Sequence, residues 1–148
     1  MKLSATTLSV MKNYSTINSN LLIKPGSELA TRSASKSTIS VATVEEKFDH
    51  EIGIVDLNSF LNTYSLFENP EIELNDNFMI IKDNTKKVKY WYAKASVLSV
   101  PEFLINPNGN RPTVQDSFLE FDLPQKTIQD VMKAANVMNL PHIVVELS

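Results

Sequence analysis

The chain has 148 residues, 43% of them hydrophobic and 21% charged, with no cysteine and a formal net charge of −3 at pH 7. This composition suits a folded domain with a real core. The lack of cysteine excludes disulfides, thiolate metal sites and cysteine nucleophiles, and the acidic balance argues against a generic nucleic-acid-binding protein. No apolar run approaches a membrane span and the N-terminus lacks a signal-peptide pattern, so we expect a cytosolic protein.

The first predicted elements are a helix and several short strands. Residues 4–18 carry apolar side chains at helical spacing behind Ser4, a favourable N-cap residue. Short apolar or alternating runs then predict strands at residues 21–24, 28–33, 38–44 and 47–55.

A second helix and three more strands follow. Asp56 is expected to cap a helix over residues 57–67. The sequence then predicts strands at residues 71–74, 78–81 and 87–92, with polar turn residues between them. Helices and antiparallel strands in this order indicate an α+β fold.

The strand at 87–92 is both basic and aromatic. Alternation places Lys87, Lys89 and Trp91 on one face and Val88 and Tyr90 on the other. We favour an edge strand that its lysines protect from aggregation. The alternatives are a contact between subunits and a surface on which nucleic-acid bases stack.

Residues 95–113 break the pattern of helices and strands. Three prolines disfavour a helix or a central strand there, yet the segment is unusually apolar, so we expect a linker that lies along a surface groove. Beyond it, the sequence predicts a strand at 118–122, a helix at 124–139 and a final strand at 143–147.

The end of the chain resembles its beginning. Val10-Met11-Lys12 recurs as Val131-Met132-Lys133, and Asn18 matches Asn139 at the same offset. A helix that runs into an apolar strand is therefore used twice, and such repeats imply architecture. The predicted domains are a complete first domain at 1–94, a linker at 95–116 and an incomplete second domain, strand-helix-strand, at 117–148.

Positive charge is concentrated on the predicted helices. They carry three lysines, Lys12, Lys126 and Lys133, and one aspartate, whereas the remaining chain is net acidic. Lysines are common on solvated helix faces and need no special explanation. The alternative is a weakly positive helix layer that contacts the phosphates of a polyanion without reading bases and is sensitive to salt.

No residue set in the sequence supports catalysis. His50 and His142 lack a metal-spaced partner, so we expect solvated or hydrogen-bonded side chains. The acidic run at residues 45–51 is interpreted as a solvated strand edge, because it has no calcium-type loop. Phosphate-cradling and nucleophile-elbow motifs are absent from the sequence. We therefore expect no enzymatic activity, no cofactor and no metal site.

Several runs resemble one protein family. Met-Lys-Leu-Ser at the N-terminus, Lys12-Asn13 and Thr16-Ile17-Asn18-Ser19 resemble the start of the DNA polymerase sliding clamps of T-even-type bacteriophages. Residues 56–66 resemble that family's second helix, and the linker after Trp91 and the helix after Pro124 also match. The resemblance covers the whole chain through order and spacing, not through a catalytic signature.

The resemblance implies a processivity factor with the DNA-clamp fold. Such clamps are rings, trimeric in this phage group, that encircle duplex DNA without sequence specificity and tether the replicative polymerase. Helices line the hole and curved sheets form the outside, so Lys12, Lys126 and Lys133 would face DNA. A clamp loader would be a further partner, and the location would be the cytoplasm of the infected bacterial host.

The resemblance also implies two protein-binding surfaces. Partner peptides bind these clamps in an apolar pocket near the linker, for which the candidate residues here are Val97, Leu98, Phe103, Leu104 and Ile105. Rings close by pairing edge strands of neighbouring subunits, for which the candidate residues are Val88, Tyr90, Trp91, Ile143 and Val145.

The chain departs from the family in length, because family members continue through a complete second domain. We expect either a fragment or a truncated form, in which the strand at 143–147 pairs with another chain. The alternative function is a structural module that docks partners through the apolar linker and does not bind DNA.

Overall fold

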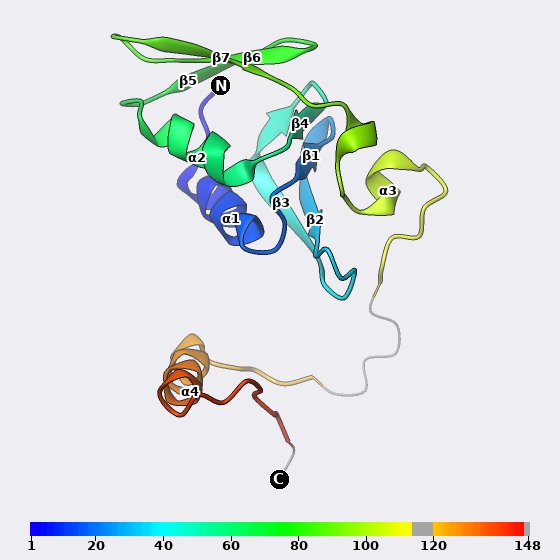
Figure 1. The fold of residues 1–148 in the computed structure, drawn as a ribbon, viewed down its shortest axis with the longest axis vertical. Helices are drawn as coiled ribbons and strands as arrows, with labels where there is room; N and C mark the ends of the chain where they lie inside the picture. The colour runs from blue at the N-terminus through cyan, green and yellow to red at the C-terminus, as the bar shows by residue number, and fades with distance from the viewer. Residues whose placement is uncertain (114–119, 147–148) are drawn as a thin grey trace. The chain divides into compact units, whose positions relative to one another are not determined.

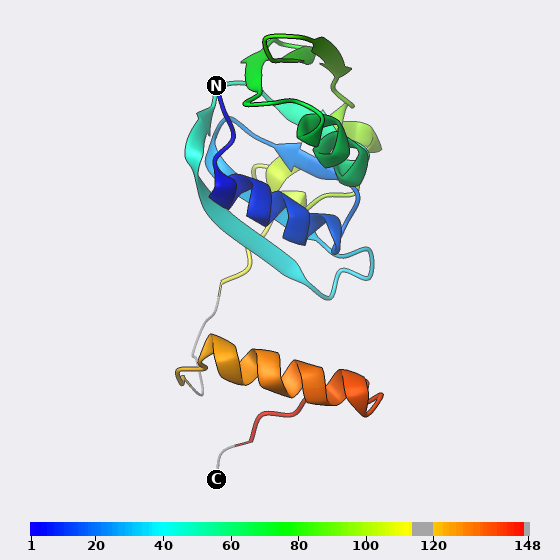
Figure 2. The same cartoon turned by 90° about the vertical axis from the view of Figure 1, so that its left-hand side faces the viewer.

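The computed structural model describes residues 1–113 and 120–146. The chain divides into two compact units, Met1–Pro112 and Thr113–Ser148, which are described separately. In the first unit, a helix followed by antiparallel strands occurs twice in succession (Figures 1 and 2). This order agrees with the predicted α+β class.

Residues 1–112 form three small antiparallel sheets. Their strands are β1 (Leu21–Ile23) with β4 (Ile52–Ile54), β2 (Gly26–Arg32) with β3 (Ile39–Phe48), and the row β5 (Glu71–Leu74), β6 (Phe78–Lys82) and β7 (Lys87–Trp91). The predicted strand break between residues 44 and 47 is wrong. β3 continues through these residues, and the side chains of Val44, Glu46 and Phe48 all point into the core. Because Glu46 is charged, the sequence pattern suggested that the strand ends there, but its carboxylate is buried like its apolar neighbours.

That carboxylate fixes the start of α1 (Ala5–Ser15). The Ser4 hydroxyl accepts a hydrogen bond from the Thr7 amide at 3.1 Å, and Glu46 accepts hydrogen bonds from the Ser4 amide and the Thr7 hydroxyl. The N-terminus of a helix favours a negative charge. Burial alone would raise the pKa of Glu46, but the hydrogen bonds from Thr7 and Ser4 outweigh burial and hold this pKa below the usual glutamate range.

The core of the first unit lies between the two helices and the sheets. α1 packs beside α2 (Leu57–Ser65) and against β3. Met11 and Phe60 are each 1% exposed, and Ile81 of β6 is fully buried. Tyr14 also donates its hydroxyl to the Leu29 carbonyl at 3.2 Å, so it joins helix to sheet. Removal of this apolar surface from water is the main stabilising contribution to the unit.

The turn between α1 and β1 contacts several distant segments. The Asn18 side-chain amide donates to the carbonyls of Arg32 and Ser99 at 2.8 and 2.7 Å. The Asn20 side chain donates to the Val55 carbonyl at 2.7 Å and accepts from the Ser99 amide at 2.8 Å. The turn therefore ties the linker to the first sheets.

The linker contains two short helical turns, η1 (Ala95–Val97) and α3 (Glu102–Ile105). The expectation of no helix in this segment is wrong. α3 begins directly after Pro101 and ends before Pro107, and a single turn of this kind fits between two prolines because neither ring interrupts an internal hydrogen bond.

Two further contacts hold the linker against the first unit. Leu98 and Val100 are buried together with Leu22. The Ala93 amide donates to the Gly53 carbonyl at 2.9 Å. A β carbon at position 53 would lie 2.0 Å from the Ala93 carbonyl oxygen, so only glycine allows the linker to pass this close.

The second unit contains α4 (Gln125–Val137), close to the predicted helix. Residues 120–122 and 143–146 form no strand, so the predicted strands at 118–122 and 143–147 are wrong over these residues. Residues 118, 119 and 147 lie outside the described residues. A strand needs a neighbouring strand that completes the hydrogen bonds of its backbone, and residues 120–146 contain no such strand. Among the described residues, no helix combines the length and apolarity needed to cross a bilayer.

We predict that Glu46→Gln destabilises the first unit by about 1–3 kcal/mol at pH 7, because it weakens charge-assisted hydrogen bonds at a buried helix end. The folded-state pKa is depressed, so this contribution is present above the unfolded pKa and is lost as pH falls through the folded pKa. Urea unfolding at pH 7 and pH 3 should therefore show a difference from wild type that shrinks at pH 3. The neighbouring exposed Glu45→Gln is the control, and a difference independent of pH would contradict the prediction.

We predict that Gly53→Ala destabilises the first unit by about 1–3 kcal/mol and releases the start of the linker, because a backbone oxygen cannot move aside cheaply. Thermal unfolding measures the first effect, and amide exchange at Ala93 measures the second. Val55→Ala, at an exposed position beyond the same strand, serves as the control. Unchanged exchange at Ala93 would show that the linker does not depend on this approach.

Candidate DNA-facing and protein-docking surfaces

The exposed faces of α1 and α2 carry no acidic residue. Lys12 lies exposed in the last turn of α1, where a cation suits the negative end of the helix dipole. α2 contributes neutral polar side chains, among them Asn58 and Asn62, and its N-cap is Asp56. The hydrogen bond from the Ser59 amide to this carboxylate, with the Ser59 hydroxyl, holds the pKa of Asp56 below its usual range. Lys12 is therefore the one charged residue within α1 and α2 themselves.

α4 carries the other two candidate lysines. Lys126 and Lys133 are both exposed and lie two turns apart on one helix. Lys126 forms an ion pair with Asp130 at 2.7 Å, with its side chain 86% exposed. Such an exposed pair is weak, so it partly offsets the charge of Lys126 without burying it. Lys133 and Lys12 occupy the matching helix positions that the repeat predicts.

Acidic residues are concentrated on the strands and their connections. Glu45 lies exposed on β3, and Glu71 and Glu73 lie exposed on β5. These carboxylates outside the helices are thus exposed at the surface.

β7 lies at the edge of its sheet, where it pairs with β6. The favoured interpretation of an edge strand that carries lysines is confirmed. Trp91 is 63% exposed and Val88 is 39% exposed. Tyr90 packs against Phe60, with ring centroids 5.4 Å apart, so its side chain faces the core. Ile143 and Val145 lie exposed in the second unit but not in a strand.

The five linker candidates divide by exposure. Val97 and Ile105 are exposed, and Phe103 and Leu104 are half-buried. Leu98 is only 8% exposed and belongs to the small cluster with Leu22, so it anchors the linker and does not present a docking side chain. This placement corrects the expectation for Leu98.

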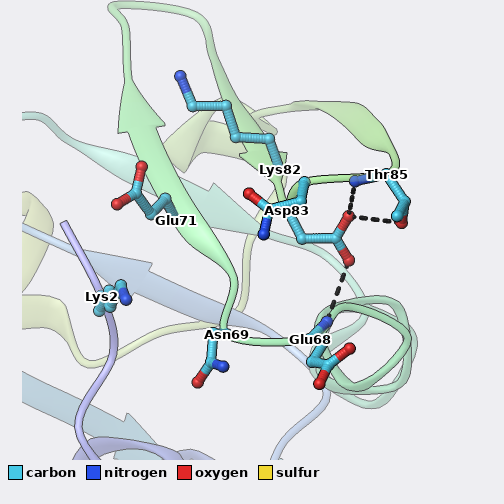
Figure 3. Close-up of a pocket in the computed structure, with 8 residues that line it drawn as sticks. Lys2, Glu68, Asn69, Glu71, Lys82, Asp83 and Thr85 are labelled. Atoms are coloured by element: carbon cyan, nitrogen blue, oxygen red, sulfur yellow. Dashed lines mark hydrogen bonds between the residues drawn. The ribbon is translucent and has the colours of Figure 1, made fainter.

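A polar depression of ≈ 450 Å³ lies beside the turn from β6 to β7 (Figure 3). Asp83 accepts hydrogen bonds there from the amides of Thr85, Glu68 and Lys86 at 2.8, 3.0 and 2.9 Å. These hydrogen bonds, the one from Thr85 first, hold the pKa of Asp83 far below its usual range. The carboxylate is therefore committed to the turn and is not a free acid or base.

The histidines form no catalytic arrangement. His50 contacts Asp49 at 2.6 Å through Nδ1 and Asp76 at 3.4 Å through Nε2, which confirms the expectation of a hydrogen-bonded side chain. His142 lies exposed in the second unit. Within residues 1–113 and 120–146, no three His, Cys, Asp or Glu side chains are grouped to hold a metal ion.

Sequence patterns missed the residues that position the linker. In the sequence, Asn18 stands out only as a position of the repeat and of the family resemblance, and Asn20 does not stand out at all. In the structure, both side chains hydrogen-bond to Ser99, far along the chain. Arg111 forms a two-pronged ion pair with Glu28, with both N–O distances 2.8 Å, and the hydrogen bond from Arg111 lowers the pKa of Glu28. The sequence shows that these residues are able to form hydrogen bonds or ion pairs, but it does not indicate which distant residue each one contacts.

Comparison with known sequences now decides the family. The sequence pattern of the family described as "DNA polymerase processivity factor" matches residues 2–99, which include α1, α2, all the strands of the first unit and the start of the linker. The chain belongs to this family. The recognised resemblance to phage sliding clamps is thereby confirmed.

Three curated relatives agree with this assignment, and each is called a sliding clamp. The relative from Vibrio phage KVP40 is 33% identical over 147 residues, which is 98% of this chain and 64% of the relative. That from Escherichia phage RB69 is 34% identical over 94 residues, 63% of this chain and 41% of the relative. That from Enterobacteria phage T4 is 30% identical over 115 residues, which is 76% of this chain and 47% of the relative. The chain thus spans less than two thirds of the length of these relatives.

Proposed function

We propose that this chain is a clamp subunit that encircles duplex DNA in a closed oligomer and tethers the replicative polymerase. The observation that carries the proposal is the acid-free helix layer, α1 and α2, of a processivity-factor domain, on a chain whose residues outside the helices are net acidic. A layer of this kind attracts phosphates without reading bases. A topological tether needs no tight contact, so a few exposed lysines suffice.

In this proposal, Lys12, Lys126 and Lys133 face the DNA. All three lie exposed on helices. Lys12 and Lys133 lie at matching positions in the sequence repeat. This supports the same role for both, because a ring built from repeated units presents equivalent helix faces to the duplex. The residues of the sheets lie outside, which keeps their carboxylates away from phosphates.

Subunit contact is proposed along the free edge of β7, with Val88 and Trp91 beside it. An edge strand offers unpaired backbone groups to another chain. Ile143 and Val145 are proposed for the second-unit side of such a contact, where pairing with a partner would supply the ladder that residues 143–146 do not form in the single chain. A closed trimer is the assembly proposed, with a clamp loader required to open it.

The exposed apolar residues Val97 and Ile105, with the half-buried Phe103 and Leu104, are proposed as the linker side of a docking site for the polymerase. They also favour the second candidate function, a docking module that does not bind DNA.

The domain boundaries at 94 and 116 remain predictions, and the proposed place of action is the host cytoplasm.

The two functions are separated by reversing the three helix lysines. We predict that Lys12→Glu/Lys126→Glu/Lys133→Glu weakens duplex binding at low salt and makes the slope of log K against log salt shallower by about 2.7, which is about 0.9 for each lysine. Anisotropy of a labelled duplex measures both. The control is Lys24→Glu/Lys36→Glu/Lys47→Glu, which makes the same change in the net charge of the chain through three lysines outside the helices. It should bind like wild type. Equal binding by the two triple variants would favour the docking module.

Assembly is tested by light scattering coupled to size exclusion. We predict a discrete species at three times the 16.6 kDa chain mass that persists on dilution, because ring closure makes several contacts at once. A mass that falls steadily to that of one chain on dilution would contradict a closed ring for this chain while leaving its family membership intact.

A further inference from the structure

One surface of the first unit serves neither the helix layer nor the linker. It is the outward face of β6 and β7, formed by Phe78, Lys87, Lys89 and Trp91, and we call it the basic–aromatic face. The register pairs Phe78 with Trp91 on this side of the sheet. Met79 and Ile81, which alternate with these residues, are buried on the other side. The face is therefore exposed by the pleat of the sheet and is not part of the core.

The segment that carries this face is rich in positive charge. Residues 82–94 contain five lysines and one acidic residue, which is +4 in a chain whose total is −3. Lys82 pairs with Glu73, and Lys86 pairs with Asp83. Lys87 and Lys89 have no carboxylate partner among the described residues. The face thus holds uncompensated charge.

The register makes this charge costly in the free chain. Lys82 and Lys87 are directly opposite each other on neighbouring strands, and like charges in that position destabilise a sheet. Glu73 offsets only Lys82. Glu71 and Glu73 lie on β5, two strands from β7, so the positive strip along β7 remains open. An anion beside β7 would relieve the repulsion.

The aromatic rings hold one of these cations in place. The Lys89 ammonium lies 3.8 Å from the Phe78 ring centroid and 4.4 Å from that of Trp91, and the two centroids are 5.2 Å apart. Cation–π contact orients the ammonium but does not neutralise it. Trp91 is 63% exposed, so part of its ring system is open to stacking.

We propose that the basic–aromatic face binds single-stranded nucleic acid. An anionic backbone would follow Lys87 and Lys89 along β7, and a base would stack on the exposed part of Trp91. Proteins that bind single strands without sequence preference combine these two contacts. A duplex keeps its bases stacked inside and would use only the lysines, and an acidic peptide would leave the tryptophan without a partner. The face therefore fits a single strand better than either.

Trp91 also lies beside the proposed subunit contact, but the two contacts use different atoms. Pairing of the β7 edge with another chain uses backbone groups in the plane of the sheet, whereas the basic–aromatic face points out of that plane. The lysines involved are also different from Lys12, Lys126 and Lys133.

Trp91 is the chain's single tryptophan, so its fluorescence reports on this face directly. Titration of the full chain with a thymidine 20-mer at low salt should quench the emission, and the quenching should saturate. A duplex of the same length and a polyglutamate peptide are the comparison probes. Quenching by polyglutamate equal to that by the 20-mer would identify an acidic-peptide site and overturn the proposal, as would no quenching by the single strand.

Variants separate charge from stacking. By anisotropy of a labelled 20-mer, Lys87→Glu/Lys89→Glu should make the slope of log K against log salt shallower by about 1.4, which is about 0.7 for each lysine. Trp91→Leu should weaken binding at least about fivefold, whereas Trp91→Phe, which keeps a ring, should largely restore it. The control is Lys36→Glu/Lys47→Glu, which makes the same change of net charge away from this face and is expected to bind the 20-mer like wild type. Circular dichroism confirms folding, and equal binding by Trp91→Leu and Trp91→Phe would remove the stacking contact.

Discussion

The arrangement of the first unit depends on the short turn between α1 and β1. Its side chains and backbone bind the end of β2, the start of α2 and the linker, since Asn18 reaches Arg32 and Ser99 and the Leu57 amide donates to the Ser19 carbonyl at 2.8 Å. Each bond is ordinary in strength. Together they fix the end of one helix, the start of the other and the path of the linker relative to one another. The faces that the helices present to solvent follow from this turn.

With the helices fixed, charge can be divided between surfaces. Acids are absent from α1 and α2, and the buried Glu46 shows how one acid can belong to a strand and yet serve a helix. Its carboxylate lies at the positive end of α1, where a negative charge is stabilising. The exposed helix surface then remains free of negative charge. A chain with net charge −3 can in this way carry a surface that suits phosphates.

Local patterns predicted α1, α2, α4 and most strands of the first unit, because the spacing of apolar residues and the caps Ser4 and Asp56 are local signals. They failed where a distant contact decides the outcome. The continuity of β3 depends on Glu46 meeting α1, and the position of the linker depends on Asn18, Asn20 and Gly53. The strand predicted at 143–147 failed over residues 143–146 for a related reason. An apolar sequence specifies a strand only when a neighbour completes its hydrogen bonds.

The third sheet shows how a single element keeps several surfaces independent. Side chains along β7 alternate between the two faces of the sheet. Tyr90 therefore packs in the core beside Phe60, whereas Lys89 and Trp91 point outward. The free edge lies between these faces and uses only backbone atoms. A change at Lys89 therefore alters the outer charge without opening a cavity, whereas a change at Tyr90 alters the core without altering that charge. Because the pleat separates these effects, contact with a subunit and contact with a nucleic acid can be assigned to different atoms of the same five-residue strand.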